Sequence, residues 1–269
     1  MTIGESKEGT ILDRIAAYAR IRVAKDKEKL DLSGARSSAL AAGPGKGGSF
    51  YRAMEKPGLS VICEVKKASP SKGIIDPVFD YKKAALDYEA AGADGISCLT
   101  EPKWFLGSDD IFRQIRAEVE TPMLRKDFVV DEYQLYQARL MGADCILLIC
   151  ALLDTGTISR YLEICDELGL AVLTEAHDEE EIRSAAAAGA RMIGVNNRNL
   201  KDFSVNLGNA ARLREHIPAG CLYVAESGVK TPEDAAALRA AGADAVLVGE
   251  ALMRTEDKKG FISRMREQR

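Results

Sequence analysis

The segment Val61-Ile62-Cys63-Glu64-Val65-Lys66-Lys67-Ala68-Ser69-Pro70-Ser71-Lys72-Gly73 decides how the rest of the chain can be arranged. It begins as a short β-branched run, which predicts a buried strand. Glu64 and Lys66 stand two residues apart and therefore on the same side of that strand. Ionised side chains in a core are costly unless they are paired or used. The pattern indicates either an edge strand with a solvated face or a strand that ends in a functional site.

Further apolar runs follow this segment, and helical stretches separate them. Strands are predicted at 61–65, 95–99, 122–126, 144–149, 171–175, 191–196, 221–226 and 244–248. Helices are predicted in the intervening stretches, for example at 80–91, 131–140, 178–188 and 232–241. This strict succession predicts an α/β fold with a parallel sheet.

A short motif recurs where helices end. Ala-Gly-Ala-Asp occupies 91–94 and 241–244, Gly-Ala-Asp occupies 142–144, and Ala-Gly-Ala-Arg occupies 188–191. The copies recur every second βα unit, at intervals of about 50 residues, which is typical of a closed (β/α)8 TIM barrel. A doubly wound open sheet is the competing fold. That fold is expected to carry G-x-G-x-x-G after its first strand, and the sequence has no such turn there.

The residues before the first strand predict an additional N-terminal helix. Between Thr10 and Asp31, apolar residues such as Ile11, Ile15 and Val23 recur at helical spacing. The glycine-rich run at 42–49 lacks the G-x-x-x-x-G-K-[ST] spacing of a phosphate loop and indicates a flexible connector. We therefore expect residues 1–269 to form a single (β/α)8 barrel domain with an N-terminal helical extension at 1–49.

The composition is that of an ordinary globular protein. Of the 269 residues, 46% are hydrophobic and 29% are charged. The net charge of −4 argues against binding to nucleic acid, and no apolar run approaches the roughly 20 residues of a membrane span. The first residues lack the apolar core of a signal peptide, so we expect a cytoplasmic protein.

The six cysteines and two histidines do not predict a metal site. No Cys-x-x-Cys pair occurs, and neither His177 nor His216 has zinc-ligand spacing. We interpret the cysteines as reduced, buried thiols, with a nucleophilic or metal-bound cysteine as the less favoured alternative. His177 is expected to begin a helix with Asp178 rather than to transfer protons.

Charged and amide side chains stand where the predicted strands end. In a (β/α)8 barrel these ends form one mouth, which holds the active site. Five of these residues continue the inward alternation of their strands, and their convergence predicts a functional site. Its acid–base chemistry would depend on Lys and Glu side chains whose pKa values burial and neighbouring charges move toward neutrality. The five are Glu64, Lys126, Glu175, Asn196 and Glu226.

The last two strands are followed by Ser227-Gly228 and by Gly249-Glu250. Barrels of this class commonly bind phosphate at this place, through backbone N–H groups. For either glycine alone, a tight turn is a fair alternative. The pair favours a phosphorylated substrate.

Apolar side chains follow other strand ends at Trp104, Phe105, Phe128 and Leu200. They are expected either to pack against outer helices or to form a flat pocket for an aromatic ring. The sequence leaves both interpretations open, most evenly for Trp104.

Five motifs together resemble the indole-3-glycerol-phosphate synthase family. They are Glu-Val-Lys-Lys-Ala-Ser-Pro-Ser-Lys-Gly, Leu-Arg-Lys-Asp-Phe, Gly-Val-Asn-Asn-Arg-Asn-Leu, Ala-Glu-Ser-Gly and Leu-Val-Gly-Glu-Ala-Leu-Met. The resemblance covers nearly the whole chain, and it implies a (β/α)8 barrel with an extra N-terminal helix. It also implies a lyase of tryptophan biosynthesis that closes the indole ring of 1-(2-carboxyphenylamino)-1-deoxyribulose 5-phosphate and releases carbon dioxide and water.

The resemblance also implies roles for individual residues. Lys126 looks like the family's general acid and Glu175 like a general base. Lys66 looks like the catalytic lysine that contacts the substrate carboxylate and has been assigned acid roles. Glu64, Asn196 and Glu226 match its polar ring-closure residues, and Arg198 matches the arginine on the carboxylate side. The substrate- and phosphate-contacting positions correspond to Ser69, Ser227, Gly228, Gly249 and Glu250, and those around the anthranilate ring to Phe105, Phe128 and Leu200.

The family departs from this sequence at two places. Thr-Glu-Ala-His surrounds Glu175 in place of Val-Glu-Val-His, and Trp104-Phe105-Leu106-Gly107 replaces Phe-Phe-Gln-Gly. Both departures concern pocket shape and leave the catalytic groups in place. The expected reaction needs no cofactor and no metal, and the expected ligand is a small phosphorylated molecule. Two other functions fit the pattern less well: another phosphosugar enzyme, and a barrel that only binds a phosphorylated ligand.

Overall fold

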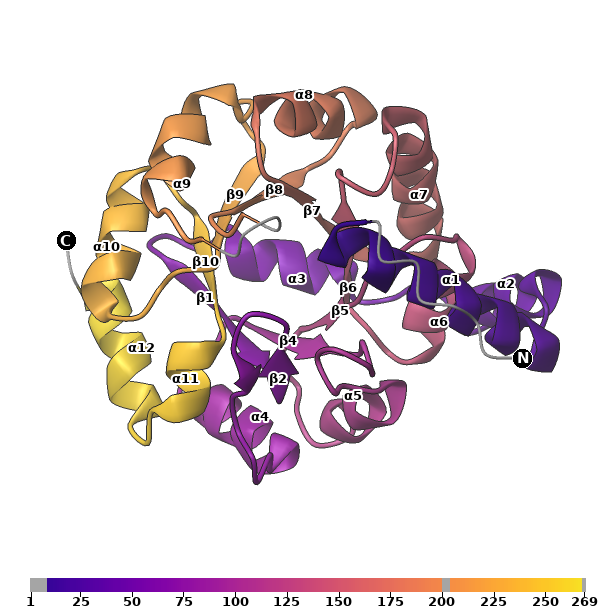
Figure 1. Cartoon of the computed structure of the whole chain (residues 1–269), viewed down its shortest axis with the longest axis horizontal. Helices are drawn as coiled ribbons and strands as arrows, with labels where there is room; N and C mark the ends of the chain where they lie inside the picture. Colours follow the sequence, from indigo (N-terminus) through magenta and orange to yellow (C-terminus); the bar gives the residue numbers. More distant parts are fainter. Residues whose placement is uncertain (1–8, 200–203, 268–269) are drawn as a thin grey trace.

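A closed barrel of eight parallel strands forms the centre of the computed structural model, which describes residues 9–199 and 204–267 (Figure 1). The strands are β1 (Ser60–Val65), β4 (Gly95–Leu99), β5 (Met123–Lys126), β6 (Cys145–Ile149), β7 (Ala171–Ala176), β8 (Met192–Asn196), β9 (Leu222–Glu226) and β10 (Ala245–Val248). They follow one another around the barrel in chain order, and β1 pairs with both β4 and β10. The predicted fold is confirmed, and each predicted strand lies within one residue of its observed bounds.

Helices surround the barrel and connect its strands (Figure 1). They are α4 (Tyr81–Ala90), α5 (Asp109–Arg116), α6 (Tyr133–Leu140), α7 (Thr155–Leu168), α8 (Glu179–Ala188), α9 (Gly208–Leu213), α10 (Pro232–Ala240), α11 (Glu250–Arg254) and α12 (Lys258–Glu267). Local chemistry fixes several of their starts: Asp80, Asp154 and Asp178 each accept a backbone N–H in the first turn of the helix that follows. Such caps are worth about 1 kcal/mol each. None of the described helices is long and apolar enough to cross a membrane.

The recurring Gly-Ala-Asp motif connects the ends of α4, α6 and α10 to neighbouring strands. Its glycines adopt positive φ, as at Gly92 (81°) and Gly142 (80°), and so reverse the chain after a helix. Its aspartates then accept backbone N–H groups at the starts of neighbouring strands. Asp144 accepts from Met123 at 2.8 Å, and Asp94 from Val61 and Asp244 from Tyr223 do the same at 2.9 and 2.8 Å. The repeat therefore holds the amino-terminal end of the barrel together.

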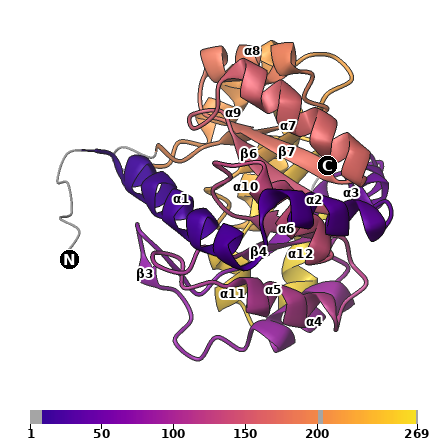
Figure 2. The ribbon, with the colours of Figure 1, turned by 90° about the vertical axis from the view of Figure 1, so that its right-hand side faces the viewer.

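Three helices precede β1: α1 (Ile11–Lys29), α2 (Leu32–Ala41) and α3 (Gly47–Met54). The predicted N-terminal helix is present as α1. Figure 2 shows α1 and α3 at opposite ends of the barrel. Since α1 contributes Ile11, Leu12 and Ile15 to the cavity at the carboxyl ends of the strands, it lies over the mouth.

The prediction of a flexible connector at 42–49 is wrong for its second half, where α3 begins at Gly47. Gly47 donates its N–H to the Gly169 carbonyl at 2.8 Å, and a Cβ there would lie 2.2 Å from the Ala171 nitrogen. The glycine therefore allows close contact between two backbones. Phe50 and Met54 of α3 then close the amino-terminal end of the barrel.

The barrel interior is apolar toward the amino-terminal ends of the strands and polar toward their carboxyl ends. Phe50 and Met54 pack with strand residues that face the barrel axis, among them Ile62, Leu124 and Leu173. Two residues further along the same strands stand Glu64, Lys126 and Glu175. Because successive side chains of a strand alternate between its faces, these charged residues share the inward face of the apolar ones.

Candidate active site

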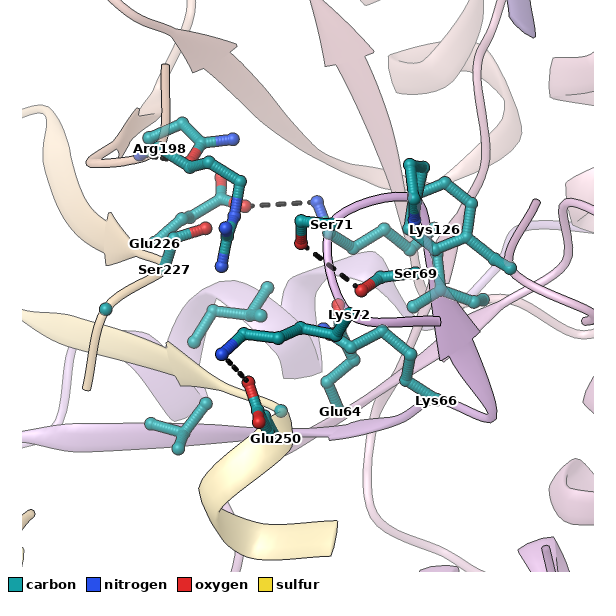
Figure 3. A pocket seen from close by; sticks show the side chains of 18 of the residues that line it. Glu64, Lys66, Ser69, Ser71, Lys72, Lys126, Arg198, Glu226, Ser227 and Glu250 are labelled. Carbon is teal, nitrogen blue, oxygen red and sulfur yellow. Dashed lines mark hydrogen bonds and ion pairs between the residues drawn. The ribbon is translucent and has the colours of Figure 1, made fainter. Parts of the chain in front are cut away.

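The candidate residues surround one cavity of about 700 Å³ at the carboxyl ends of the strands. Its volume lies in the usual range for small-molecule sites. Figure 3 shows several of the labelled side chains converging on it from different strands. Leu200 lies outside the described residues. The other candidates all line the cavity: Glu64, Lys66, Ser69, Phe105, Lys126, Phe128, Glu175, Asn196, Arg198, Glu226, Ser227, Gly228, Gly249 and Glu250.

Lys126, at the end of β5, connects two carboxylates from other strands. Its Nζ lies 3.1 Å from Glu226 Oε2 on β9 and 3.3 Å from Glu175 Oε2 on β7. Burial alone would lower the pKa of Lys126, but Glu226, Glu175 and Glu64 together raise it above its ordinary value. Lys126 is therefore a buried ammonium at neutral pH, aimed at the cavity.

The two carboxylates that contact Lys126 have pKa values shifted in opposite directions. Burial and repulsion from Glu175 and Glu64 raise the pKa of Glu226 to about 7, despite the nearby ammonium. Burial also acts on Glu175, but Lys126, His177 and a hydrogen bond from Asn196 lower its pKa below the ordinary value. At neutral pH, Glu226 can thus hold a proton while Glu175 stays ionised. Such a divergence between neighbouring carboxyls is a usual basis for separate acid and base roles.

Glu64 and Lys66 form a close ion pair at the end of β1. The edge-strand interpretation of this segment is wrong, because β1 has a partner strand on each side and Glu64 is buried inside the barrel. A Cβ at Gly249 would lie 2.5 Å from Glu64 Oε1 and 2.8 Å from Lys66 Nζ. Gly249 therefore lets the backbone after β10 pass beside this ion pair.

Aromatic side chains line another part of the cavity. The rings of Phe105 and Phe128 lie 5.9 Å apart between centroids, with an interplanar angle of 38°. Trp104 instead packs edge-to-face on Tyr18 of α1, at 5.8 Å, and does not line the cavity. Phe105 and Phe128 therefore line the cavity, whereas Trp104 packs against a helix.

The turn after β9 takes positive φ at Ser227 and Gly228. Their φ values are 65° and 100°, so Ser227 adopts a conformation that residues other than glycine rarely take. A Cβ at Gly228 would lie 2.7 Å from Leu207 Cδ2 and 2.8 Å from Val205 Cγ1. The turn itself therefore requires glycine at position 228, in addition to any contact that Gly228 makes with phosphate. Strain at a functional site persists only where the surrounding structure holds it.

The carboxylate of Glu250 faces cations rather than open space. Its oxygens lie 3.7 Å from Lys72 Nζ and 3.2 Å from Arg254 Nε (Figure 3 shows the pair with Lys72). Lys72 and Ser69 belong to the loop around the short hairpin of β2 (Ala68–Ser69) and β3 (Gly73–Ile74). A carboxylate repels phosphate. Glu250 could therefore contact an anion only through its backbone N–H.

Several residues of the site were not found from the sequence. Gly194 lies inside β8, where a Cβ would lie 2.2 Å from Glu226 Oε1. A glycine inside a strand often marks such a close approach, so this one carried a signal. Arg22 of α1 donates to both oxygens of Asp127, at 2.7 and 3.1 Å, and so connects the helix over the mouth to the end of β5. Nothing local in the sequence predicts that pair.

His177 does precede a helix, as expected, since Asp178 caps α8. Its ring, however, points back toward the site, with Nε2 3.6 Å from Glu175 Oε1. Nothing in the sequence predicts this contact. The six cysteines are free, and within residues 9–199 and 204–267 no group of three or more His, Cys, Asp and Glu could hold a metal ion.

The fold and the site together define a (β/α)8 barrel with buried Lys and Glu side chains gathered at its mouth. A model of the family described as indole-3-glycerol phosphate synthase matches residues 12–265. The indole-3-glycerol phosphate synthase of Ruminiclostridium cellulolyticum is 51% identical, over 95% of this chain and 98% of the relative. That of Endomicrobium trichonymphae is 48% identical, over 96% and 98%. The chain belongs to the indole-3-glycerol phosphate synthase family.

A solved structure of lower similarity shares the fold alone. The 3-hexulose-6-phosphate synthase of Salmonella typhimurium superposes with a TM-score of 0.62 at 14% identity, over 78% of this chain and 98% of that one. This likeness supports the barrel architecture. It carries no information about the substrate of the present chain.

Proposed function

We propose that the chain closes the indole ring of 1-(2-carboxyphenylamino)-1-deoxyribulose 5-phosphate, with Lys126 as the general acid. The observation that carries the proposal is the Lys126 ammonium, held between Glu175 and Glu226 and facing a cavity that also holds Phe105 and Phe128. Ring closure joins an aromatic carbon to a carbonyl carbon, and the carbonyl oxygen must gain a proton as the bond forms. An ammonium can supply that proton.

The remaining steps need a second acid and a base. Loss of carbon dioxide restores the aromatic ring, and loss of water then requires a proton for the leaving hydroxyl and removal of a proton from the methylene carbon next to the nitrogen, which forms the new ring double bond. Glu175 stays ionised and suits the role of base. Glu226, whose pKa is raised to about 7, can return a proton to Lys126, which lies 3.1 Å away. Asn196 supports Glu175 by a hydrogen bond.

Substrate orientation follows from the distribution of charge and apolar surface. The anthranilate ring would lie against Phe105 and Phe128, with its carboxylate toward Lys66 and Arg198. The phosphate would lie at the backbone of Ser227, Gly228 and Gly249. These assignments place each end of the substrate against side chains or backbone groups of matching polarity in the cavity lining.

We also propose that the chain works as one barrel domain, with α1 completing the apolar wall through Ile11, Leu12 and Ile15. The six free thiols fit the cytoplasm, where cysteines remain reduced. The ligand is a small phosphorylated molecule, in keeping with the family.

Formation of the fluorescent indole product from the carboxyphenylamino substrate tests this function. Lys126→Ala should lower kcat by about 10²- to 10⁴-fold and change substrate affinity little. Lys82→Ala is the matched control, because Lys82 only forms an exposed ion pair with Glu118. A wild-type protein that yields no indole product would overturn the reaction. A Lys126→Ala variant that retains more than a tenth of wild-type kcat would overturn the role of Lys126 alone.

A further inference from the structure

Three hydrogen bonds from two residues hold His177 beside Glu175. Its ring Nδ1 lies 3.2 Å from Glu181 Oε2 in the first turn of α8, and its backbone N–H donates to the same oxygen at 2.8 Å. Asn209 of α9 donates its side-chain amide to the His177 carbonyl at 3.3 Å. The contact at Nδ1 orients the ring and brings Nε2 to 3.6 Å from Glu175 Oε1.

Both ring nitrogens of His177 thus face carboxylates. A neutral imidazole has one N–H donor and one acceptor, so it would direct a lone pair at one of the two carboxylates. Imidazolium has two donors and suits both. In the part of the chain that the structure describes, buried Nε2 has no hydrogen-bond partner within bonding distance, which leaves its proton available to Glu175. Burial lowers the pKa of His177, but the bond to Glu181 and the charge of Glu175 outweigh it and raise the pKa above its ordinary value.

The groups around His177 on other strands favour the same charge state. Glu226 on β9 adds a weaker negative field to those of Glu175 and Glu181. The thiol of Cys150, just after β6, remains neutral because burial and the charges of Glu181 and Glu175 raise its pKa to about 12. Lys126 lies on another oxygen of Glu175, at 3.3 Å. Glu175 therefore lies between the ammonium of Lys126 and the ring of His177.

We propose that His177 is a positioning residue, whose imidazolium fixes the Glu175 carboxylate opposite Lys126 and keeps it ionised for its role as base. Glu181 in turn orients His177 through Nδ1. This inference rests on the proposed function, since it assigns a supporting group to the same site. His177 itself is not among the residues that line the cavity.

Kinetics of His177→Gln test this role. Loss of the imidazolium should move the acidic limb of the kcat–pH profile to higher pH by about one unit, because Glu175 loses a cation. A misplaced carboxylate should lower kcat by about 10- to 100-fold, with a smaller change in KM. Glu181→Gln should move the acidic limb of the profile in the same direction by a smaller amount. His216 lies outside the cavity, so His216→Gln should leave the kcat–pH profile unchanged.

A spectroscopic measurement makes the test independent of turnover. The chain has two histidines, so His216→Gln leaves a single imidazole whose titration NMR can follow. We expect this imidazole to titrate above its ordinary pKa, and its pKa to fall in the Glu181→Gln, His216→Gln double variant. A pKa at or below the ordinary value would overturn the proposal, as would a folded His177→Gln enzyme with unchanged kcat and acidic limb. If no indole product formed at all, the function would fail while the titration still reported on the contact.

Discussion

Replacing Gly194 with alanine would test whether the position of Glu226 matters for turnover. Gly194 lies in β8, opposite Glu226 Oε1, and the added Cβ would lie 2.2 Å from that oxygen and 3.1 Å from Leu173 Cδ1. To reach ordinary contact distance, the oxygen must retreat by about 1 Å or more. The other oxygen of the same carboxylate lies 3.1 Å from Lys126 Nζ, so the movement would disturb this ion pair.

The expected loss follows from that displacement. A shift of about 1 Å in a catalytic group can lower the rate by about 10²-fold, so we expect kcat of Gly194→Ala to fall by about two orders of magnitude. Crowding of a packed interior costs about 1–3 kcal/mol, so the variant should remain folded with a lowered Tm. Indole-product fluorescence measures the first effect and thermal denaturation the second.

Two comparisons make the result interpretable. Gly156→Ala lies in α7, where the nearest atom to the new Cβ, Asp154 Oδ1, is at an ordinary 3.4 Å, and both kcat and Tm should be retained. In a Glu226→Gln background, Gly194→Ala should cost much less than in the wild type, because the group it displaces is already inactive. Equal losses in both backgrounds, or a folded Gly194→Ala enzyme with more than a third of wild-type kcat, would refute the reasoning.

Two other predictions concern charge. Because burial raises the pKa of Glu226 to about 7 from 4.5, its protonated form favours the native state at low pH, and that contribution is lost as pH rises through about 7. Glu226→Gln imitates the protonated form. The Tm of this variant minus the Tm of the wild type should therefore rise between pH 5 and pH 8, by the equivalent of about 3 kcal/mol. A Tm difference that stays constant with pH would contradict the raised pKa. Glu250→Gln removes a negative charge beside Lys72 and Arg254 and should strengthen inhibition by inorganic phosphate about three- to tenfold at low salt. An inhibition constant that does not change would place the phosphate elsewhere.

The sequence determined the barrel because the fold depends on local, repeated signals. Most strands are largely apolar runs, several helices begin at a side-chain cap, and the Gly-Ala-Asp motif ends several helices with a glycine at positive φ. The candidate residues of the site were also readable in the sequence. Once the strands are parallel, Glu64, Lys126, Glu175 and Glu226 must meet at one mouth, since they end strands that run in the same direction.

Only the tertiary structure decided how those residues act on one another. The sequence does not show that Lys126 contacts Glu175 and Glu226, because the pairs are separated by 49 and 100 residues. It also gave no sign that Arg22 of α1 binds Asp127. The opposite pKa shifts of two chemically identical carboxyls, Glu175 and Glu226, follow from burial and from the neighbours that each acquires. Secondary structure and side-chain direction depend on nearby residues, whereas charge states depend on distances that exist only in the closed barrel.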